Sequence, residues 1–147
     1  MNRKIINSQK TNYGFTLIEM LVVVAIMATL MALIAPRFIE RAEEAKVTAT
    51  VAQLQQISTA LDMYKLDNST YPTIDQGLQA LVEKPFGSPE PKNWKHYLNE
   101  VPLDAWKNEI YYVYPGEHGV YDLYSLGADG QQGGEGSNAD IGNWTQN

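Results

Sequence analysis

The sequence of 147 residues is long enough for one domain, and its formal net charge of −6 is unevenly distributed. Residues 1–14 hold three basic residues and no acidic residue, which leaves 11 − 3 = 8 basic against 17 acidic residues in the remainder. This acidity excludes a nucleic-acid-binding domain, which needs a basic face. There is no cysteine, so a hydrophobic core or a bound metal must hold the fold in place of disulfides.

An apolar segment of membrane-spanning length follows the basic leader. It runs from Phe15 to Ala35, about 21 residues, and a spanning helix needs about 20. The preceding basic residues predict that the N-terminus stays in the cytoplasm while the remainder is exported. We expect a leader at 1–14, the transmembrane half of a long helix at 15–36, and an exported head at 37–147. A secretory signal peptide is disfavoured, because its apolar region is shorter and ends in a small-x-small cleavage site.

Glu19 is a carboxylate inside this apolar segment. An uncompensated charge in a bilayer costs about 2.5–3.5 kcal/mol on insertion scales, so such a residue is a functional candidate. At a spacing of four it shares a helix face with Phe15. If the chain is cut after Gly14, the new α-amine of Phe15 lies about one turn away. The expected partner of Glu19 is then the amine of a neighbouring subunit at the same depth; the alternative is a bystander glutamate at a helix start.

Beyond Pro36 the sequence predicts an amphipathic continuation of the helix to about residue 66. Its apolar positions recur at steps of four and three, as on one helix face: Val47, Val51, Leu54, Ile57, Leu61 and Tyr64. A helix over 16–66 would be roughly 75 Å long. Two separate helices are the alternative, which differs only in whether residues 36–46 are helical.

The remaining chain predicts a small head with an α+β fold. Its expected elements are a breaker cluster at 67–72, a capping box at Thr73 and Gln76 before a short helix at 77–82, a loop at 85–91, an irregular stretch at 101–108, and strands at 109–114 and 120–126 around a turn at 115–119. These strands predict a small antiparallel sheet packed against the long helix.

The loop at 126–144 is rich in glycine and contains three acidic residues and no basic one. Oxygen donors on a backbone that turns sharply suit a hard cation such as Ca²⁺, which takes six to eight oxygens. An EF-hand is excluded, because a strand precedes the loop and its last position is Asp140 rather than glutamate. A single Gly133-Gly134-x-Gly136 run cannot stack into a β-roll. A merely flexible loop remains the alternative to a metal site.

Gly14-Phe-Thr-Leu-Ile-Glu19, followed by an apolar helix, resembles the type IV prepilin signature. The resemblance implies cleavage after Gly14 by a prepilin peptidase and methylation of the new amine of Phe15. It also implies the type IV pilin-like fold, in which a long N-terminal helix packs on a small sheet.

Later segments resemble the major pseudopilin family of type II secretion systems. They are 62–67, 71–72, 76–81, 115–119, 125–130 and 138–144. In that family the C-terminal loop binds Ca²⁺, and the resemblance implies as ligands the Leu126 carbonyl, Asp129, the Gln131 carbonyl, Asp140 and an oxygen of Ser137, with Glu135 as a rival. One departure is 104–108, Asp-Ala-Trp-Lys-Asn, where the family usually has Asp-Pro-Trp-Gly-Asn.

The resemblance implies a structural subunit of a Gram-negative bacterium and not an enzyme. It would sit in the inner membrane with its head in the periplasm. An assembly platform would extract it into a homo-oligomeric helical filament, together with minor pseudopilins, to drive export of folded proteins across the outer membrane. A type IV pilin for adhesion or motility is the alternative. Against an enzyme, the two histidines, His96 and His118, form no metalloprotease motif, and Ser125 lies in no nucleophile elbow.

Overall fold

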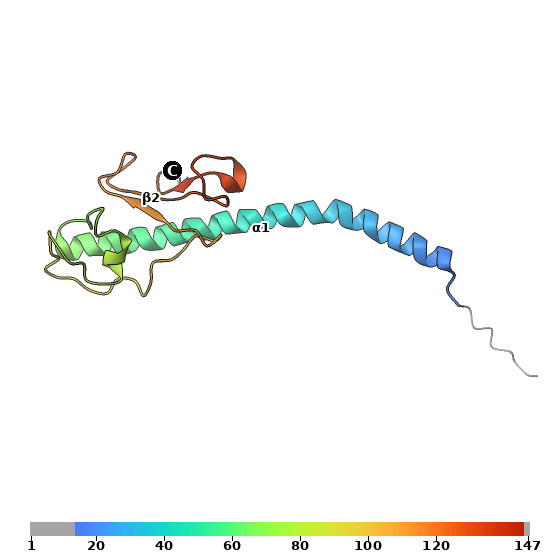
Figure 1. Cartoon of the computed structure of the whole chain (residues 1–147), viewed down its shortest axis with the longest axis horizontal. Helices are drawn as coiled ribbons and strands as arrows, with labels where there is room; N and C mark the ends of the chain where they lie inside the picture. Colours follow the sequence, from blue (N-terminus) through green and yellow to red (C-terminus); the bar gives the residue numbers. More distant parts are fainter. Residues whose placement is uncertain (1–13, 146–147) are drawn as a thin grey trace, which may run out of the picture. The chain divides into compact units, whose positions relative to one another are not determined.

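The computed structural model of the protein describes residues 14–145, without the side chains of residues 35 and 36. The chain divides into two units, Met1–Ile39 and Glu40–Asn147. The elements in chain order are the helix α1 (Leu17–Asn68), the 3-10 helix η1 (Leu78–Leu81), the strands β1 (Tyr111–Val113) and β2 (Asp122–Ser125), the 3-10 helix η2 (Gly136–Asn138) and the strand β3 (Ile141–Gly142) (Figure 1). Apart from Gly14, the predicted leader lies outside the described residues.

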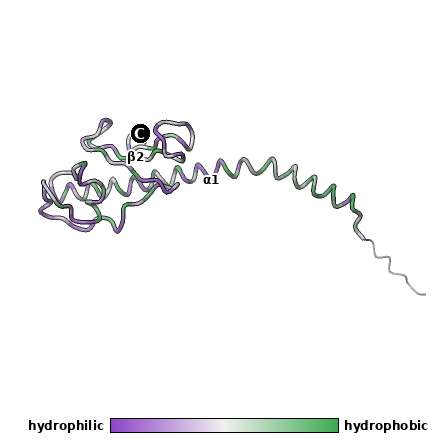
Figure 2. The backbone as a smooth tube through the Cα atoms, viewed as in Figure 1, coloured by the Kyte–Doolittle hydropathy of each residue, from purple (hydrophilic) through white to green (hydrophobic). Residues whose placement is uncertain are grey.

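The first unit consists of the apolar part of α1. All of its large apolar side chains from Phe15 to Ile34 are exposed. Figure 2 shows this part of the helix as mostly hydrophobic. By length and composition α1 could cross a membrane, as predicted. Residues 36–46 are helical and belong to the same element, so one continuous helix is correct and two separate helices are wrong.

The core of the second unit is built on the C-terminal half of α1. Leu54, Ile57 and Leu61 are fully buried and Tyr64 is 1% exposed, as their spacing predicted. Each such aliphatic side chain contributes roughly 1.5–3 kcal/mol when it is removed from water. Val47 and Val51, at the start of the predicted stripe, are only partly buried. The head therefore packs most tightly on the last four turns of the helix.

Three short antiparallel strands cover this helix face in the order β1-β2-β3. Tyr112 pairs with Leu123, and Ser125 pairs with Ile141. Because side chains alternate along a strand, these four residues share one face of the sheet. Leu123, Ser125 and Ile141 are buried, which identifies that face as the inner one. Tyr111 and Tyr124 stack on the other face, with ring centroids 5.3 Å apart.

The α+β prediction is confirmed, with corrections to individual elements. Both predicted strands exist but are shorter than expected, and the sequence analysis missed β3, which lies inside the predicted loop. Thr73 and Gln76 exchange the two hydrogen bonds of a capping box, at 3.1 and 3.3 Å. They close a turn rather than begin a helix, because Gly77 caps the following element, and that element is a 3-10 helix.

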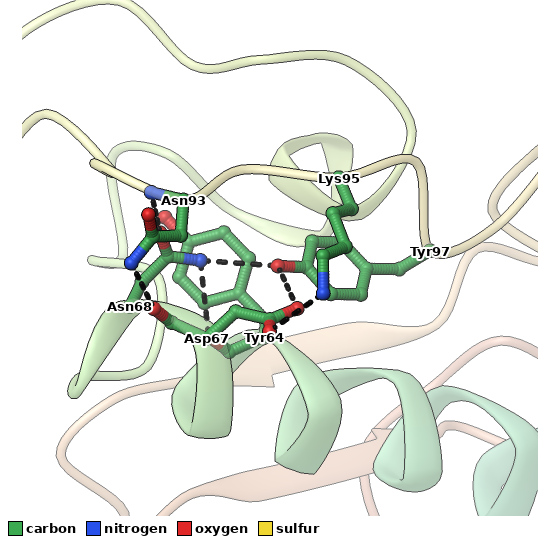
Figure 3. Close-up of polar contacts among 6 residues, drawn as sticks. All are labelled: Tyr64, Asp67, Asn68, Asn93, Lys95 and Tyr97. Carbon is green, nitrogen blue, oxygen red and sulfur yellow. Dashed lines mark hydrogen bonds and ion pairs between the residues drawn. The ribbon is translucent and has the colours of Figure 1, made fainter.

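Side-chain amides hold the C-terminal end of α1, where the last carbonyls have no partner within the helix (Figure 3). Asn68 donates from Nδ2 to the Tyr64 carbonyl at 3.0 Å and to the Tyr97 hydroxyl at 3.1 Å. Its Oδ1 accepts the Asn93 N–H at 3.0 Å. Lys95 forms an ion pair with Asp67 at 2.9 Å, and this hydrogen bond holds the pKa of Asp67 below its ordinary value. Residues 93–97 are thereby tied to the helix end.

Replacing Asn68 with alanine should therefore destabilise the head. The substitution removes three hydrogen bonds, and of their partners the Tyr97 hydroxyl keeps another, Asp67 Oδ2 at 3.1 Å, so we expect a loss of about 1–3 kcal/mol in the free energy of unfolding. Urea unfolding of the full chain in detergent measures the loss. Asn99→Ala is the matched control, because the Asn99 side chain is exposed. Equal stabilities for the two variants would contradict the role of Asn68.

Candidate functional site

Glu19 caps the start of α1. Its Oε2 accepts hydrogen bonds from the backbone N–H of Thr16 at 2.8 Å and from the Thr16 hydroxyl at 2.9 Å. In return, the N–H of Glu19 donates to the Thr16 hydroxyl at 3.3 Å. This reciprocal pair is a capping box, whose signal, a threonine followed three residues later by glutamate, was present in the sequence and was missed. Glu19 therefore has a local structural partner within its own chain.

The C-terminal loop is closed by backbone contacts between its two arms. The Ala128 N–H donates to the Ser137 carbonyl at 2.9 Å, and Gly127 has a φ of 69°. A Cβ atom on Gly127 would meet the backbone of residues 137–139 at 2.8 Å, so only glycine permits this approach. The two arms of the loop are therefore held together by their backbones, and the short helix η2 lies on the second arm.

Two of the predicted ligands, Asp129 and Asp140, have carboxylate oxygens that bind the loop backbone. Asp129 Oδ1 accepts the Gln131 N–H at 3.0 Å, and Asp140 Oδ2 accepts the Gly133 N–H at 3.0 Å. The other oxygen of Asp140, Oδ1, is buried and has no hydrogen-bond partner. An unpaired buried carboxylate oxygen is costly, and a cation would satisfy it. This atom is the observation in the loop that fits a metal site.

The other predicted ligands do not all lie around the same cavity as Asp140. Leu126 and Asp140 line one cavity of about 580 Å³, and the lining does not include Asp129, Gln131 or Ser137. Within residues 14–145, no group of three or more His, Cys, Asp or Glu side chains is arranged to hold a metal. A cation here would therefore depend on backbone carbonyls as well as the two aspartates, which is the donor set that Ca²⁺ accepts.

His118 and Asp122 border the same cavity, and the sequence analysis treated His118 only as a turn residue. Its Nδ1 lies 3.0 Å from Asp122 Oδ2, and its ring stacks on Trp144 with centroids 4.0 Å apart. Burial alone would raise the pKa of Asp122. Hydrogen bonds from the His118 ring and from the N–H groups of Glu117 and His118 outweigh burial and hold that pKa below its ordinary value. These contacts join the hairpin turn to the end of the loop.

Asp104 organises the turn at 104–108, and sequence reasoning missed its role. The residue is 2% exposed. Its Oδ1 accepts the N–H groups of Trp106 and Asn108 at 2.9 and 2.8 Å, and its Oδ2 accepts the Ser125 hydroxyl at 2.6 Å. An aspartate that opens a turn and binds the N–H two residues on is a local pattern that could have been predicted.

Lys107 occupies the position of this turn where the resembled family usually has glycine. Its φ is 75°, in the left-handed region that side chains disfavour. Residue 107 therefore adopts the left-handed conformation as a lysine, which answers the question of conformation that the sequence left open.

Comparisons with known proteins cover both units. Residues 37–144 match the family described as "Type II secretion system (T2SS), protein G", and residues 9–35 match the "Prokaryotic N-terminal methylation motif". Type II secretion system core protein G of Pseudomonas aeruginosa is 54% identical over 133 residues, which cover 89% of this chain and 94% of the relative. The protein of the same name from Vibrio cholerae is 50% identical, covering 89% and 90%.

A solved structure agrees with these relatives. The crystal structure of the major pseudopilin from the type 2 secretion system of enterohaemorrhagic Escherichia coli is 39% identical, with a TM-score of 0.64. The match covers 71% of this chain and 91% of that one. A methylation motif that includes the apolar start of α1, followed by a head matched over its length, is what the sequence predicted. The chain therefore belongs to the type II secretion system protein G family, and its fold is that of a major pseudopilin.

Proposed function

We propose that the chain is the major subunit of a type II secretion pseudopilus, anchored in the inner membrane by the first half of α1 with its head in the periplasm. The observation that carries the proposal is an exposed apolar helix segment that belongs to a methylation motif and is joined to a protein G head. Such a helix is stable in lipid or against other copies of itself. The match of the head to protein G favours this function over a type IV pilin for adhesion or motility.

Assembly would exchange lipid contacts of α1 for helix–helix packing in a homo-oligomeric filament. An assembly platform would extract the subunits, and minor pseudopilins would join the same fibre. After cleavage behind Gly14, the amine of Phe15 carries a positive charge that Glu19 of a neighbouring subunit can pair with. A misaligned stack would leave both charges unpaired in an apolar medium, so the pair would set the register. In the isolated chain the same carboxylate is occupied by Thr16.

Substitutions at Glu19 should separate register from capping. Glu19→Gln keeps a side chain that suits a capping box but removes the charge, whereas Glu19→Ala removes both. If the charge sets the register, both variants should be processed and membrane-bound but fail to form filaments or to support secretion. Filament yield by electron microscopy and secreted protein in the medium are the measurements. Normal assembly of Glu19→Gln with defective Glu19→Ala would assign the defect to capping and refute the register role.

Replacing Gly14 with a bulky residue should prevent removal of the leader. Gly14 is exposed, and nothing lies within 4 Å of a Cβ atom added to it, so the substitution leaves the fold intact. Intact-mass spectrometry of membrane-extracted protein should show a chain that begins at Met1 and lacks an added methyl group. Gly14→Ala serves as the conservative comparison. A mature mass for the bulky variant would contradict cleavage at this position.

We further propose that the C-terminal loop binds Ca²⁺. The residues that would hold it are Asp129, Asp140, the carbonyls of Leu126 and Gln131, and an oxygen of Ser137. When bound, the ion would supply positive charge to the two aspartates and join both arms of the loop. The buried, unpaired Oδ1 of Asp140 supports this proposal over a merely flexible loop. Glu135, the rival ligand, is exposed, and so are Asp129 and Gln131, so exposure does not distinguish it from them.

Calcium removal should lower the stability of the head. A ligand that binds only the folded state, present at 100 times its dissociation constant, stabilises that state by about 2.7 kcal/mol. Thermal unfolding of the full chain in detergent, with calcium or with a chelator, measures the effect. Asp140→Asn should abolish the calcium response, because it keeps the side-chain shape but removes the charge, whereas Glu135→Gln should retain it. The same melting temperature with calcium and with chelator would refute the site.

A further inference from the structure

The turn at 104–108 is more strongly fixed than a surface connection requires. Three donors converge on the buried carboxylate of Asp104, and the turn is closed by the bond from the Asp104 N–H to the Asn108 carbonyl at 2.9 Å. Neither anchoring in the membrane nor the proposed ligand set accounts for this cluster. The cluster also forms hydrogen bonds to the C-terminal loop and to α1.

The cluster holds the first arm of the C-terminal loop at Gly127. Ser125 Oγ, which donates to Asp104, accepts the Gly127 N–H at 3.1 Å. The Asn108 side chain donates from Nδ2 to the Gly127 carbonyl at 2.9 Å. Both backbone polar groups of this glycine are therefore held by side chains of a single network.

This arrangement fixes the direction of the Leu126 carbonyl. The peptide bond between Leu126 and Gly127 is planar, so its carbonyl points opposite to the N–H that Ser125 accepts. The next peptide plane is held on one side by Asn108 and on the other by the bond from the Ala128 N–H to the Ser137 carbonyl. Hydrogen bonds that do not involve the ligand atom itself orient metal ligands, and these bonds orient the Leu126 carbonyl in that way.

On its other side the turn is bonded to α1. The Ala105 N–H donates to the hydroxyl of Thr50, which is fully buried, at 3.1 Å. The Trp106 indole Nε1 donates to Glu43 Oε2 at 2.9 Å. Hydrogen bonds from Lys46 and from this indole hold the pKa of Glu43 below its ordinary value, so the carboxylate stays charged as an acceptor. Hydrogen bonds thus run from the helix through the turn to the loop.

We propose that Asp104, Ser125 and Asn108 are positioning residues that orient the Leu126 carbonyl for Ca²⁺, and that the turn couples the loop to α1 at Glu43 and Thr50. The proposal rests on the calcium site proposed above. It assigns the three residues a role in ion affinity and not only in folding. It also predicts that the Trp106 indole responds to ion binding although Trp106 is not a ligand.

Calcium affinity tests the positioning role. Isothermal titration of the full chain in detergent should show a 10- to 100-fold weaker affinity for Asn108→Ala, the range typical of residues that orient metal ligands. Asn93→Ala is the matched control, because Asn93 Nδ2 also donates to a backbone carbonyl, that of Asp67 at 3.1 Å. Melting temperatures in chelator show whether both variants remain folded. Wild-type affinity in Asn108→Ala would overturn the positioning role.

The indole N–H resonances test the coupling to α1. Calcium should shift the Trp106 resonance in the wild-type chain, and saturating calcium should shift it less in Asn108→Ala. Trp94 donates its indole N–H to the Ala80 carbonyl and should not respond in either protein. An unmoved Trp106 resonance with intact calcium binding would overturn the coupling alone. A wild-type chain that binds no calcium would overturn the calcium site and this proposal together, a result distinct from the other two.

Discussion

The head depends on the packing of one face of α1 beneath a three-stranded sheet. Leu54, Ile57 and Leu61 are fully buried there, against Leu123 and Ile141 of the sheet's inner face. The sheet is too short to be stable alone, since two- and three-residue strands need a packed partner. Every loop of the head, including the candidate ion loop, starts or ends at an element that this packing holds in place.

Features that follow from local periodicity were predictable. The steps of four and three from Leu54 to Tyr64 predicted the buried helix face, and the uncharged run from Met20 to Ala35 predicted the membrane-spanning segment. The strand β3 was not predictable in the same way, because Ile141 and Gly142 carry no alternating pattern of their own. Their strand exists because Ile141 pairs with Ser125 of β2, a tertiary contact that overrides weak local preference.

The residues of the candidate sites likewise differ in whether the local sequence could predict them. Asp129 and Asp140 could be chosen from composition, since acidic residues in a glycine-rich loop suit a hard cation. The supporting cluster could not, because Asp104 and Ser125 are far apart in sequence and their 2.6 Å contact exists only in the fold. Glu19 is a different case. Its capping partner Thr16 lies three residues away, so this contact follows from the local sequence pattern alone.

The exposed apolar half of α1 constrains the path by which a subunit can move. Removing one large apolar side chain from water is favourable by roughly 1.5–3 kcal/mol. For about a dozen such side chains, the summed free energy exceeds the roughly 5–15 kcal/mol of unfolding free energy of a typical domain. A fully hydrated subunit is therefore too costly to serve as an assembly intermediate. In the proposed pathway the growing end of the fibre has to lie within the bilayer, where a subunit passes sideways from lipid to its neighbours and its apolar helix does not cross the aqueous phase.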